Sequence, residues 1–130
     1  MKAKILYIED NSKNFYLVQY ILAAKGHEVL WARDGREGIE DAARSKPDLI
    51  LLDIQLPVMD GYAVARALRG NPELDKTAVV ALTSYAMAGD REKALAAGCD
   101  GYIEKPIDPA TFAAQIERNL PSGGSQGTET

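Results

Sequence analysis

The most telling run in this chain is Asp48-Leu49-Ile50-Leu51-Leu52-Asp53, which is apolar except at its two ends. An apolar run of this length without polar alternation is typical of a strand buried on both faces of a parallel sheet. Pro57 and Gly61 follow, which indicates a loop directly after the strand. Asp53 should therefore lie at the carboxyl end of a buried strand, where open α/β sheets bind their ligands.

A second acidic pair ends another apolar run near the amino terminus. Glu9 and Asp10 follow Ile5-Leu6-Tyr7-Ile8 in the same manner. Two central strands would then direct three carboxylates, including that of Asp53, at one crevice. Like charges at close range are costly unless a cation joins them, and carboxylate oxygens suit a hard cation such as Mg²⁺. The pattern predicts a metal-binding site.

Strand-like and helix-like segments alternate five times along the chain. Helical spacing of apolar residues, with capping residues, glycine or proline at the boundaries, defines the helices. The expected strands are 3–8, 28–32, 48–53, 77–82 and 101–104, and the expected helices are 12–25, 36–45, 61–69, 90–97 and 109–119. Repeated strand–helix units predict an α/β fold: a five-stranded parallel sheet with right-handed crossovers and five helices on both faces.

Composition restricts the class of protein. The chain has 130 residues, 46% of them hydrophobic and 26% charged, as expected of one ordinary globular domain. The net charge of -4 speaks against nucleic-acid binding, and no run reaches the ~18 apolar residues of a membrane span. Cys99 is the only cysteine and no signal-like stretch precedes Glu9, so we expect a cytoplasmic protein.

The last ten residues, 121–130, are Gly, Ser, Thr, Pro, Gln and a single Glu. Such a segment cannot bury apolar surface, so we expect a flexible tail after a domain of residues 1–120. It suits a natural terminus and a linker to a larger protein equally well.

Two later strands add complementary groups to the same edge of the expected sheet. The fourth strand runs into Thr83 and Ser84, and the fifth is followed by Lys105 and Pro106. A hydroxyl and an ammonium opposite a cation suit the oxygens of a phosphoryl group. Asp53 would be the nucleophile, because aspartyl phosphate is a recognised covalent intermediate.

These residues resemble the site of a known family. Glu9-Asp10, Asp53, Thr83 and Lys105-Pro106 are similar to the receiver domains of bacterial two-component response regulators. The resemblance extends from Lys4 to Leu120, and residues 7–11 and 53–57 are similar to stand-alone regulators. It implies a flavodoxin-like receiver fold with strand order 2-1-3-4-5. The implied function is a phospho-accepting signalling switch and not an enzyme, beyond its own phosphorylation and dephosphorylation.

The resemblance also implies the chemistry of each site residue. Asp53 accepts a phosphoryl group from the phosphohistidine of a histidine kinase or a histidine phosphotransfer protein. Asp10, Asp53 and the backbone carbonyl of Gln55 bind Mg²⁺, and Glu9 reaches the ion mainly through water. Lys105 contacts the phosphoryl oxygens, and the Lys105–Pro106 peptide bond is expected to be cis.

The same resemblance implies how the signal leaves the site. Thr83 moves its hydroxyl onto the phosphoryl group, and Tyr102 turns inward behind it. A downstream protein target reads the changed surface around the fourth helix, fifth strand and fifth helix, and the chain is a monomer or weak dimer. Gln55 and Tyr85 tune the lifetime of the phosphoryl group. The alternatives to a stand-alone regulator are a phosphorelay intermediate and the receiver of a hybrid histidine kinase.

Functions from other classes lack the residues that they need. A dinucleotide-binding enzyme requires a glycine-rich turn after the first strand, where Asn11-Ser12-Lys13 stands instead. The acids Glu9 and Asp10 would repel the phosphate of a flavin. A phosphatase with an aspartate nucleophile needs a second acid where Gln55 stands. The remaining alternative is a receiver-like interaction module that binds no metal. The presence of all five site residues speaks against it.

Five other polar or reactive residues are given structural roles. Asp48 is expected to be a loop acid, Asp60 a turn or helix-cap acid and Asp108 a helix cap. We expect His27 to be a surface turn residue, and Cys99 to be a small packed residue.

Overall fold

The computed structural model describes residues 2–56, 60–84 and 89–121. Five parallel strands form one sheet in the order β2-β1-β3-β4-β5, which confirms the order that the family resemblance implied. The strands are β1 (Lys4–Ile8), β2 (Glu28–Ala32), β3 (Leu49–Asp53), β4 (Ala78–Thr83) and β5 (Gly101–Glu104).

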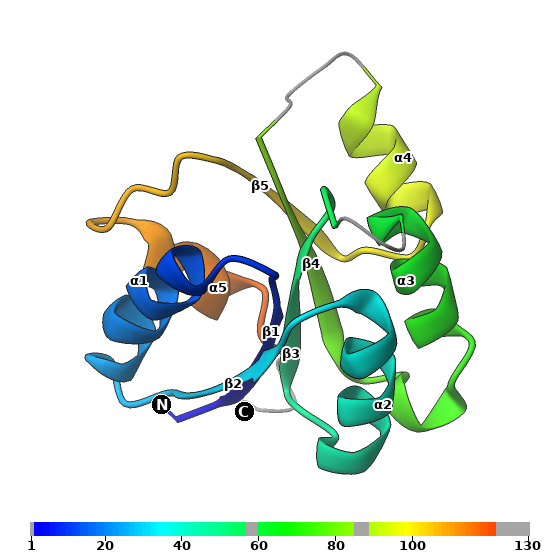
Figure 1. The fold of residues 1–130 in the computed structure, drawn as a ribbon, viewed down its shortest axis with the longest axis horizontal. Helices are drawn as coiled ribbons and strands as arrows, with labels where there is room; N and C mark the ends of the chain where they lie inside the picture. The colour runs from blue at the N-terminus through cyan, green and yellow to red at the C-terminus, as the bar shows by residue number, and fades with distance from the viewer. Residues whose placement is uncertain (1, 57–59, 85–88, 122–130) are drawn as a thin grey trace.

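Helices cover both faces of this sheet (Figure 1). The α-helices are α1 (Ser12–Ala23), α2 (Gly35–Ser45), α3 (Gly61–Arg69), α4 (Asp90–Ala96) and α5 (Phe112–Arg118). α1 and α5 bury one apolar cluster against the sheet, and α2, α3 and α4 bury a second cluster on the opposite face. Every residue of β3 and β4 is consequently buried, which explains their unbroken apolar sequences.

The predicted helix boundaries rest on side-chain caps and glycines. Asn11 accepts a hydrogen bond from the backbone N–H of Asn14 and caps α1, and Gly26 ends the following turn with φ of 90°. Asp60 caps α3 by accepting from the N–H of Tyr62, which is one of the two structural roles expected for it, a turn acid or a helix-cap acid. Gly98 follows α4 with φ of 103°, a left-handed conformation that favours glycine.

The predicted start of the last helix is wrong by three residues. Asp108 accepts a hydrogen bond from the N–H of Ala110 at its side chain, and from the N–H groups of Thr111 and Phe112 at its carbonyl. These bonds close a separate turn that contains Pro109, and α5 begins only at Phe112. Asp108 therefore caps this turn instead of the helix.

The interpretation of His27 as a surface residue is also wrong. Its side chain is buried, and its Nδ1 accepts a hydrogen bond of 3.0 Å from the backbone N–H of Ala3. Its Nε2 lies 2.9 Å from a carboxylate oxygen of Glu117 on α5. His27 thus links the start of β2 to the start of the chain and to α5.

The remaining comparisons between prediction and structure concern short segments and single residues. A short 3-10 helix, η1 (Pro72–Leu74), follows α3 where only a turn was expected. Cys99 is buried, as predicted. The expected tail lies outside the described residues from position 122 onward, as does Tyr85. None of the helices in the described part of the chain has the length and apolarity that a membrane crossing requires.

Candidate functional site

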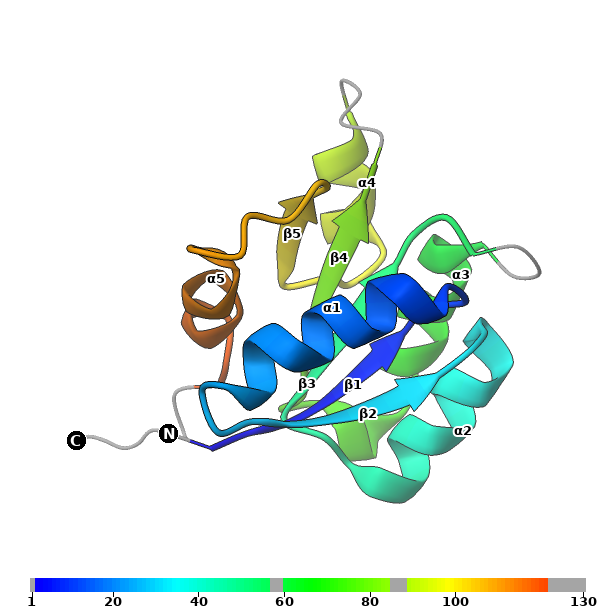
Figure 2. The ribbon, with the colours of Figure 1, turned by 60° about the vertical axis from the view of Figure 1, so that its left-hand side comes forward.

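Three acids meet at the carboxyl ends of the two central strands. Glu9 and Asp10 follow β1 and Asp53 ends β3, and these strands pair in parallel with Ile8 opposite Leu52. One carboxylate oxygen from each acid lies within 4.8 Å of the other two. Glu9 and Asp53 are buried, whereas Asp10 is exposed. The strand ends share the edge of the sheet toward which the arrowheads in Figure 2 point.

The chain after Asp53 folds back closely on itself. The backbone N–H of Gln55 donates a hydrogen bond of 2.9 Å to Asp53 Oδ1. The N–H of Gly61 donates to the carbonyl of Ile54. A β-carbon at Gly61 would lie 2.6 Å from the α-carbon of Ile54, so only glycine allows this approach. This close approach keeps the start of the following helix next to the end of β3.

Lys105 neutralises part of the acidic charge. Its Nζ lies 3.2 Å from Asp53 Oδ2 and 3.7 Å from Glu9 Oε1. The Lys105–Pro106 peptide bond is cis, as expected. Four of the predicted site groups are therefore together in one place: Glu9, Asp10, Asp53 and Lys105.

The environment of Glu9 raises the pKa of its carboxyl. Burial raises the pKa of the Glu9 carboxyl above its ordinary value, and the Asp53 charge adds to the rise, while Tyr7 and Lys105 oppose it. The hydroxyl of Tyr7 donates a hydrogen bond of 2.7 Å to Glu9 Oε1. Burial and the Glu9 charge raise the pKa of Tyr7 well above its ordinary range, so the hydroxyl keeps its proton.

The hydroxyl of Thr83 is tied to the loop after Asp53. Nε2 of Gln55 donates a hydrogen bond of 2.7 Å to Thr83 Oγ1, and Oε1 of Gln55 accepts one of 3.1 Å from the N–H of Ser84. Thr83 is buried at the end of β4 and follows Leu82, which pairs in register with Asp53.

Tyr102 lies inside a strand, two positions before β5 ends at Glu104. It is on β5, paired in register with Ala81, two positions before Thr83. Its ring is half-buried against the apolar cluster of α2, α3 and α4. Burial, followed by the charge of Asp90, raises the pKa of Tyr102. The ring is thus near β4 and α4, at the surface where a switch was expected.

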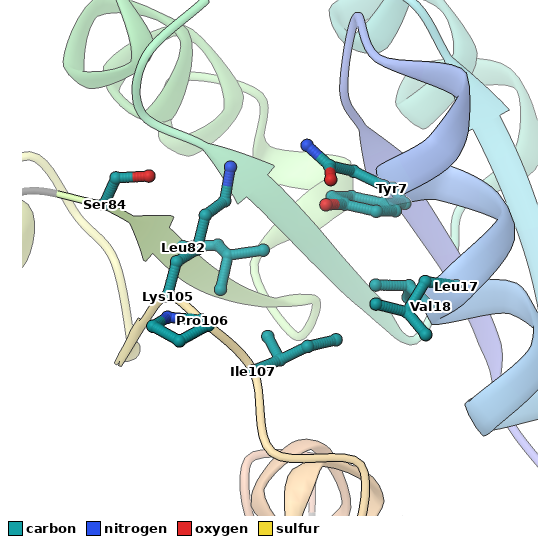
Figure 3. A pocket seen from close by; sticks show the side chains of 9 residues that line it. Tyr7, Leu17, Val18, Leu82, Ser84, Lys105, Pro106 and Ile107 are labelled. Carbon is teal, nitrogen blue, oxygen red and sulfur yellow. The ribbon is translucent and has the colours of Figure 1, made fainter.

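A pocket opens beside the site, between α1 and the segment after β5 (Figure 3). Lys105 and Ser84 stand on one side of it, and Tyr7, Leu17 and Val18 line the other. Lys105 therefore borders both the acids and this pocket.

Two residues of the site were missed by the sequence reasoning. The sequence pattern places Tyr7 in an apolar strand and gives Trp31 no role in the site. The indole N–H of Trp31 donates a hydrogen bond of 2.8 Å to the backbone carbonyl of Glu9. Strand periodicity indicates which face of the sheet carries an aromatic ring, but it does not indicate the hydrogen-bond partner of the ring's polar atom. The sequence pattern therefore could not predict these contacts.

The donor set suits a magnesium ion. All three acids supply oxygen ligands, which hard divalent cations prefer, and one of them is exposed to water. Mg²⁺ usually keeps several waters and uses only one or two carboxylates, so Asp10 and Asp53 suffice for direct ligation. Three acids beside one lysine also leave a net negative site that a divalent cation would neutralise.

The family model for the response regulator receiver domain matches residues 5–117. The polar-differentiation response regulators DivK of Brucella anthropi and Brucella ovis are each 38% identical to this chain over 120 residues. Those 120 residues cover 92% of this chain and 98% of each relative.

Solved structures with the same fold include two with clear sequence similarity. The chemotaxis protein CheY4 of Vibrio cholerae superposes with a TM-score of 0.87 at 30% identity, over 92% of this chain and all of that one. The receiver domain of a sensor histidine kinase from Pseudomonas aeruginosa gives a TM-score of 0.84 at 34% identity, over 96% of this chain and all of that one. That structure has a magnesium ion coordinated in its active-site cleft.

Proposed function

The chain belongs to the response regulator receiver domain family, and from this premise we propose that Asp53 is its phosphoryl acceptor. The protein is a phospho-accepting signalling switch of two-component systems. The observation that carries the assignment of Asp53 is its place at the end of β3, among two further acids and 3.2 Å from the ammonium of Lys105.

The proposed transfer is a substitution at phosphorus. A carboxylate oxygen of Asp53 attacks the phosphorus of a phosphohistidine on the partner, the P–N bond breaks, and the departing imidazole takes up a proton. Lys105 contacts the phosphoryl oxygens and balances their charge. The ammonium lies 3.2 Å from Asp53, and Lys105 also lines the pocket beside the site (Figure 3), which supports this role.

The proposed cofactor is Mg²⁺, held by Asp10, Asp53 and the backbone carbonyl of Gln55, with Glu9 acting mainly through water. When bound, the ion supplies positive charge that offsets the acids and the phosphoryl oxygens. The oxygen donor set of this chain supports the proposal, as does the magnesium ion in the related receiver domain from Pseudomonas aeruginosa.

The proposed switch is Thr83 with Tyr102. Phosphorylation adds a charge of about -1.5 to -2 and three acceptor oxygens to the crevice. The hydroxyl of Thr83 then exchanges Gln55 for a phosphoryl oxygen, and Tyr102 follows into the space behind it. The pairing of β4 with β5 supports this coupling, since it places both residues on neighbouring strands.

The proposed partners are proteins. A histidine kinase or a histidine phosphotransfer protein donates the phosphoryl group, and a downstream protein target reads the surface around α4, β5 and α5. We assign residues 1–120 to the receiver domain and 121–130 to a tail, and expect a cytoplasmic monomer or weak dimer. The match to the DivK regulators covers 98% of each relative, which supports a stand-alone regulator over a relay intermediate or a hybrid-kinase receiver.

Labelling with radioactive acetyl phosphate tests the acceptor. We expect the wild-type protein to take up one phosphoryl group in the presence of Mg²⁺ and to lose this labelling with EDTA or with Asp53→Asn. The matched control is Asp60→Asn, since Asp60 is a helix cap outside the acidic cluster. Labelling of Asp53→Asn at the wild-type rate would rule out Asp53 as the acceptor.

A further inference from the structure

Two aromatic side chains donate hydrogen bonds to Glu9, one to its carboxylate and the other to its backbone. The Tyr7 hydroxyl donates to the Oε1 atom of its carboxylate at 2.7 Å, and the Trp31 indole N–H donates to its backbone carbonyl at 2.8 Å. The N–H of Glu9 in turn donates to the carbonyl of Ala32 at 2.9 Å. Both the side chain and the backbone of this acid therefore have directed partners.

The two donors belong to one stack of rings, which we call the aromatic cradle: Tyr7, Phe15 and Trp31. The ring of Phe15 lies 4.5 Å from that of Trp31 with an interplanar angle of 8°, and 6.2 Å from that of Tyr7. The guanidinium of Arg33 covers Trp31 at 4.5 Å from the ring centroid. Tyr7 and Phe15 are buried. A stack with covered faces has little freedom to rotate, so its two polar atoms point in fixed directions.

The Glu9 carboxylate has a competing partner. Lys105 Nζ lies 3.7 Å from the same Oε1 atom that accepts from Tyr7, and 3.2 Å from Asp53. Without the Tyr7 hydroxyl, the carboxylate keeps the hydrogen bond of 3.2 Å from the Asn11 N–H to Oε2, and Oε1 can turn toward the ammonium to form a closer ion pair. That rotation would draw one acid away from the cluster that faces the cation, and it would divide Lys105 between two carboxylates.

We propose that Tyr7 and Trp31 are positioning residues that hold Glu9 in the orientation in which it serves the Mg²⁺ site. The inference rests on the proposed function, because it assumes a cation among these acids. Tyr7 sets the direction of the carboxylate, and Trp31 fixes the backbone from which Glu9 and Asp10 project. Partners of this kind, one step removed from the ion, commonly govern metal affinity by fixing the groups that face it.

Two conservative variants separate positioning from packing. Tyr7→Phe removes one hydroxyl and keeps the ring, and Trp31→Phe removes the N–H donor and keeps a ring in the stack. Tyr20→Phe is the matched control, because it removes the same atom from a side chain on α1 that is 79% exposed. The readout is a Mg²⁺ titration followed by the backbone amide signals of Asn11 and Gln55, whose N–H groups donate to Glu9 and Asp53.

We expect Tyr7→Phe and Trp31→Phe each to weaken Mg²⁺ binding about tenfold, and Tyr20→Phe to leave it unchanged. Acetyl phosphate labelling of Tyr7→Phe should need more Mg²⁺ for half its maximal rate, while the rate at saturating Mg²⁺ returns to that of the wild type. Thermal unfolding without Mg²⁺ measures the packing effect separately.

A Mg²⁺ dissociation constant within twofold of the wild type would overturn the proposal for the variant concerned, even if that variant unfolds at a lower temperature. The wild-type arm tests the premise. If the wild type neither binds Mg²⁺ nor labels at Asp53, the proposed function fails as well. If the wild type does both and the variants match it, only the role of the cradle is refuted.

Discussion

Gln55 and Thr83, 28 positions apart in the sequence, are joined by a hydrogen bond of 2.7 Å from Nε2 of the glutamine to Oγ1 of the threonine. The other end of the same amide accepts from the N–H of Ser84 at 3.1 Å. One side chain thus occupies both the hydroxyl oxygen and the adjacent N–H at the end of β4. Any movement of Thr83 toward Asp53 has to exchange this bond for another.

Gln55→Ala should favour the activated arrangement in the unphosphorylated protein. A hydrogen bond of this kind contributes about 1 kcal/mol, so its loss shifts the ratio of the two arrangements roughly fivefold. The amide signals of Thr83 and Tyr102 should move toward their positions in the phosphorylated wild type. Gln19→Ala on α1 is the control, and signals that coincide with those of the unphosphorylated wild type would contradict the idea.

Lys105→Met should change metal binding and phosphorylation in opposite directions. Loss of the ammonium removes a positive charge beside Asp53 and Glu9, so Mg²⁺ should bind more tightly, by roughly tenfold or less. The phosphoryl oxygens lose their partner, so acetyl phosphate labelling should slow ~100-fold. The exposed Lys76→Met serves as the control. If both quantities fell together, the variant would have disturbed the site in a general way and the assigned role would be wrong.

Glu9→Gln should stabilise the protein when Mg²⁺ is absent. Because burial raises the pKa of Glu9 above its ordinary value of 4.5, the folded chain holds this proton more tightly than the unfolded chain. Stability is therefore lost as the pH rises from about 4.5 through the raised pKa, and it stays lost above that value. Glutamine removes this loss, so at pH 7.5 without Mg²⁺ we expect Glu9→Gln to have a higher Tm than the wild type.

Thermal unfolding of Glu9→Gln across a range of pH values checks this expectation. The exposed Glu28→Gln should leave the profile unchanged. Added Mg²⁺ should raise the Tm of the wild type more than that of Glu9→Gln. A variant that is less stable than the wild type at pH 7.5 without Mg²⁺ would show that the ionised acid does not oppose folding.

Cys99 should be unreactive in the folded protein. Burial, with a further contribution from Asp100, raises the pKa of its thiol to about 11, so at pH 8 roughly one molecule in a thousand carries the thiolate. We expect the thiol reagent DTNB to label the native protein very slowly and to react with one thiol per chain in guanidinium chloride. Rapid stoichiometric labelling of the native protein would contradict the burial of this side chain.

The element order was predictable from the sequence for reasons visible in β3 and β4. A parallel sheet covered on both faces buries every residue of its central strands, so such strands are unbroken apolar runs. Helices that pack one face carry apolar residues at helical spacing, as Phe15 and Val18 do on α1. The sequence does not predict a helix boundary that a local hydrogen bond decides. An example is the turn at Asp108, after which α5 begins three residues later than predicted.

The meeting of the acids was likewise predictable, because it depends on topology alone. Residues at the carboxyl ends of adjacent parallel strands must lie at the same edge, so Glu9, just after β1, and Asp53, at the end of β3, lie close together. The pattern could not indicate which polar atom binds which. His27 was assigned to the surface because its neighbours Gly26 and Glu28 are typical of an exposed turn, yet Ala3 and Glu117 enclose it from distant parts of the chain.

The layers of the fold, the functional edge of its sheet and the chemical groups at that edge could therefore be predicted from the sequence. Hydrophobic periodicity and the order of the strands along the chain can be seen directly in a sequence. The partners of those groups appear only in three dimensions: Tyr7 and Trp31 on Glu9, and Gln55 on Thr83. A hydrogen bond depends on the donor–acceptor distance to within a few tenths of an ångström, and on the direction in which the donor points. Packing of the whole chain sets both, so these contacts could be known only from the tertiary structure.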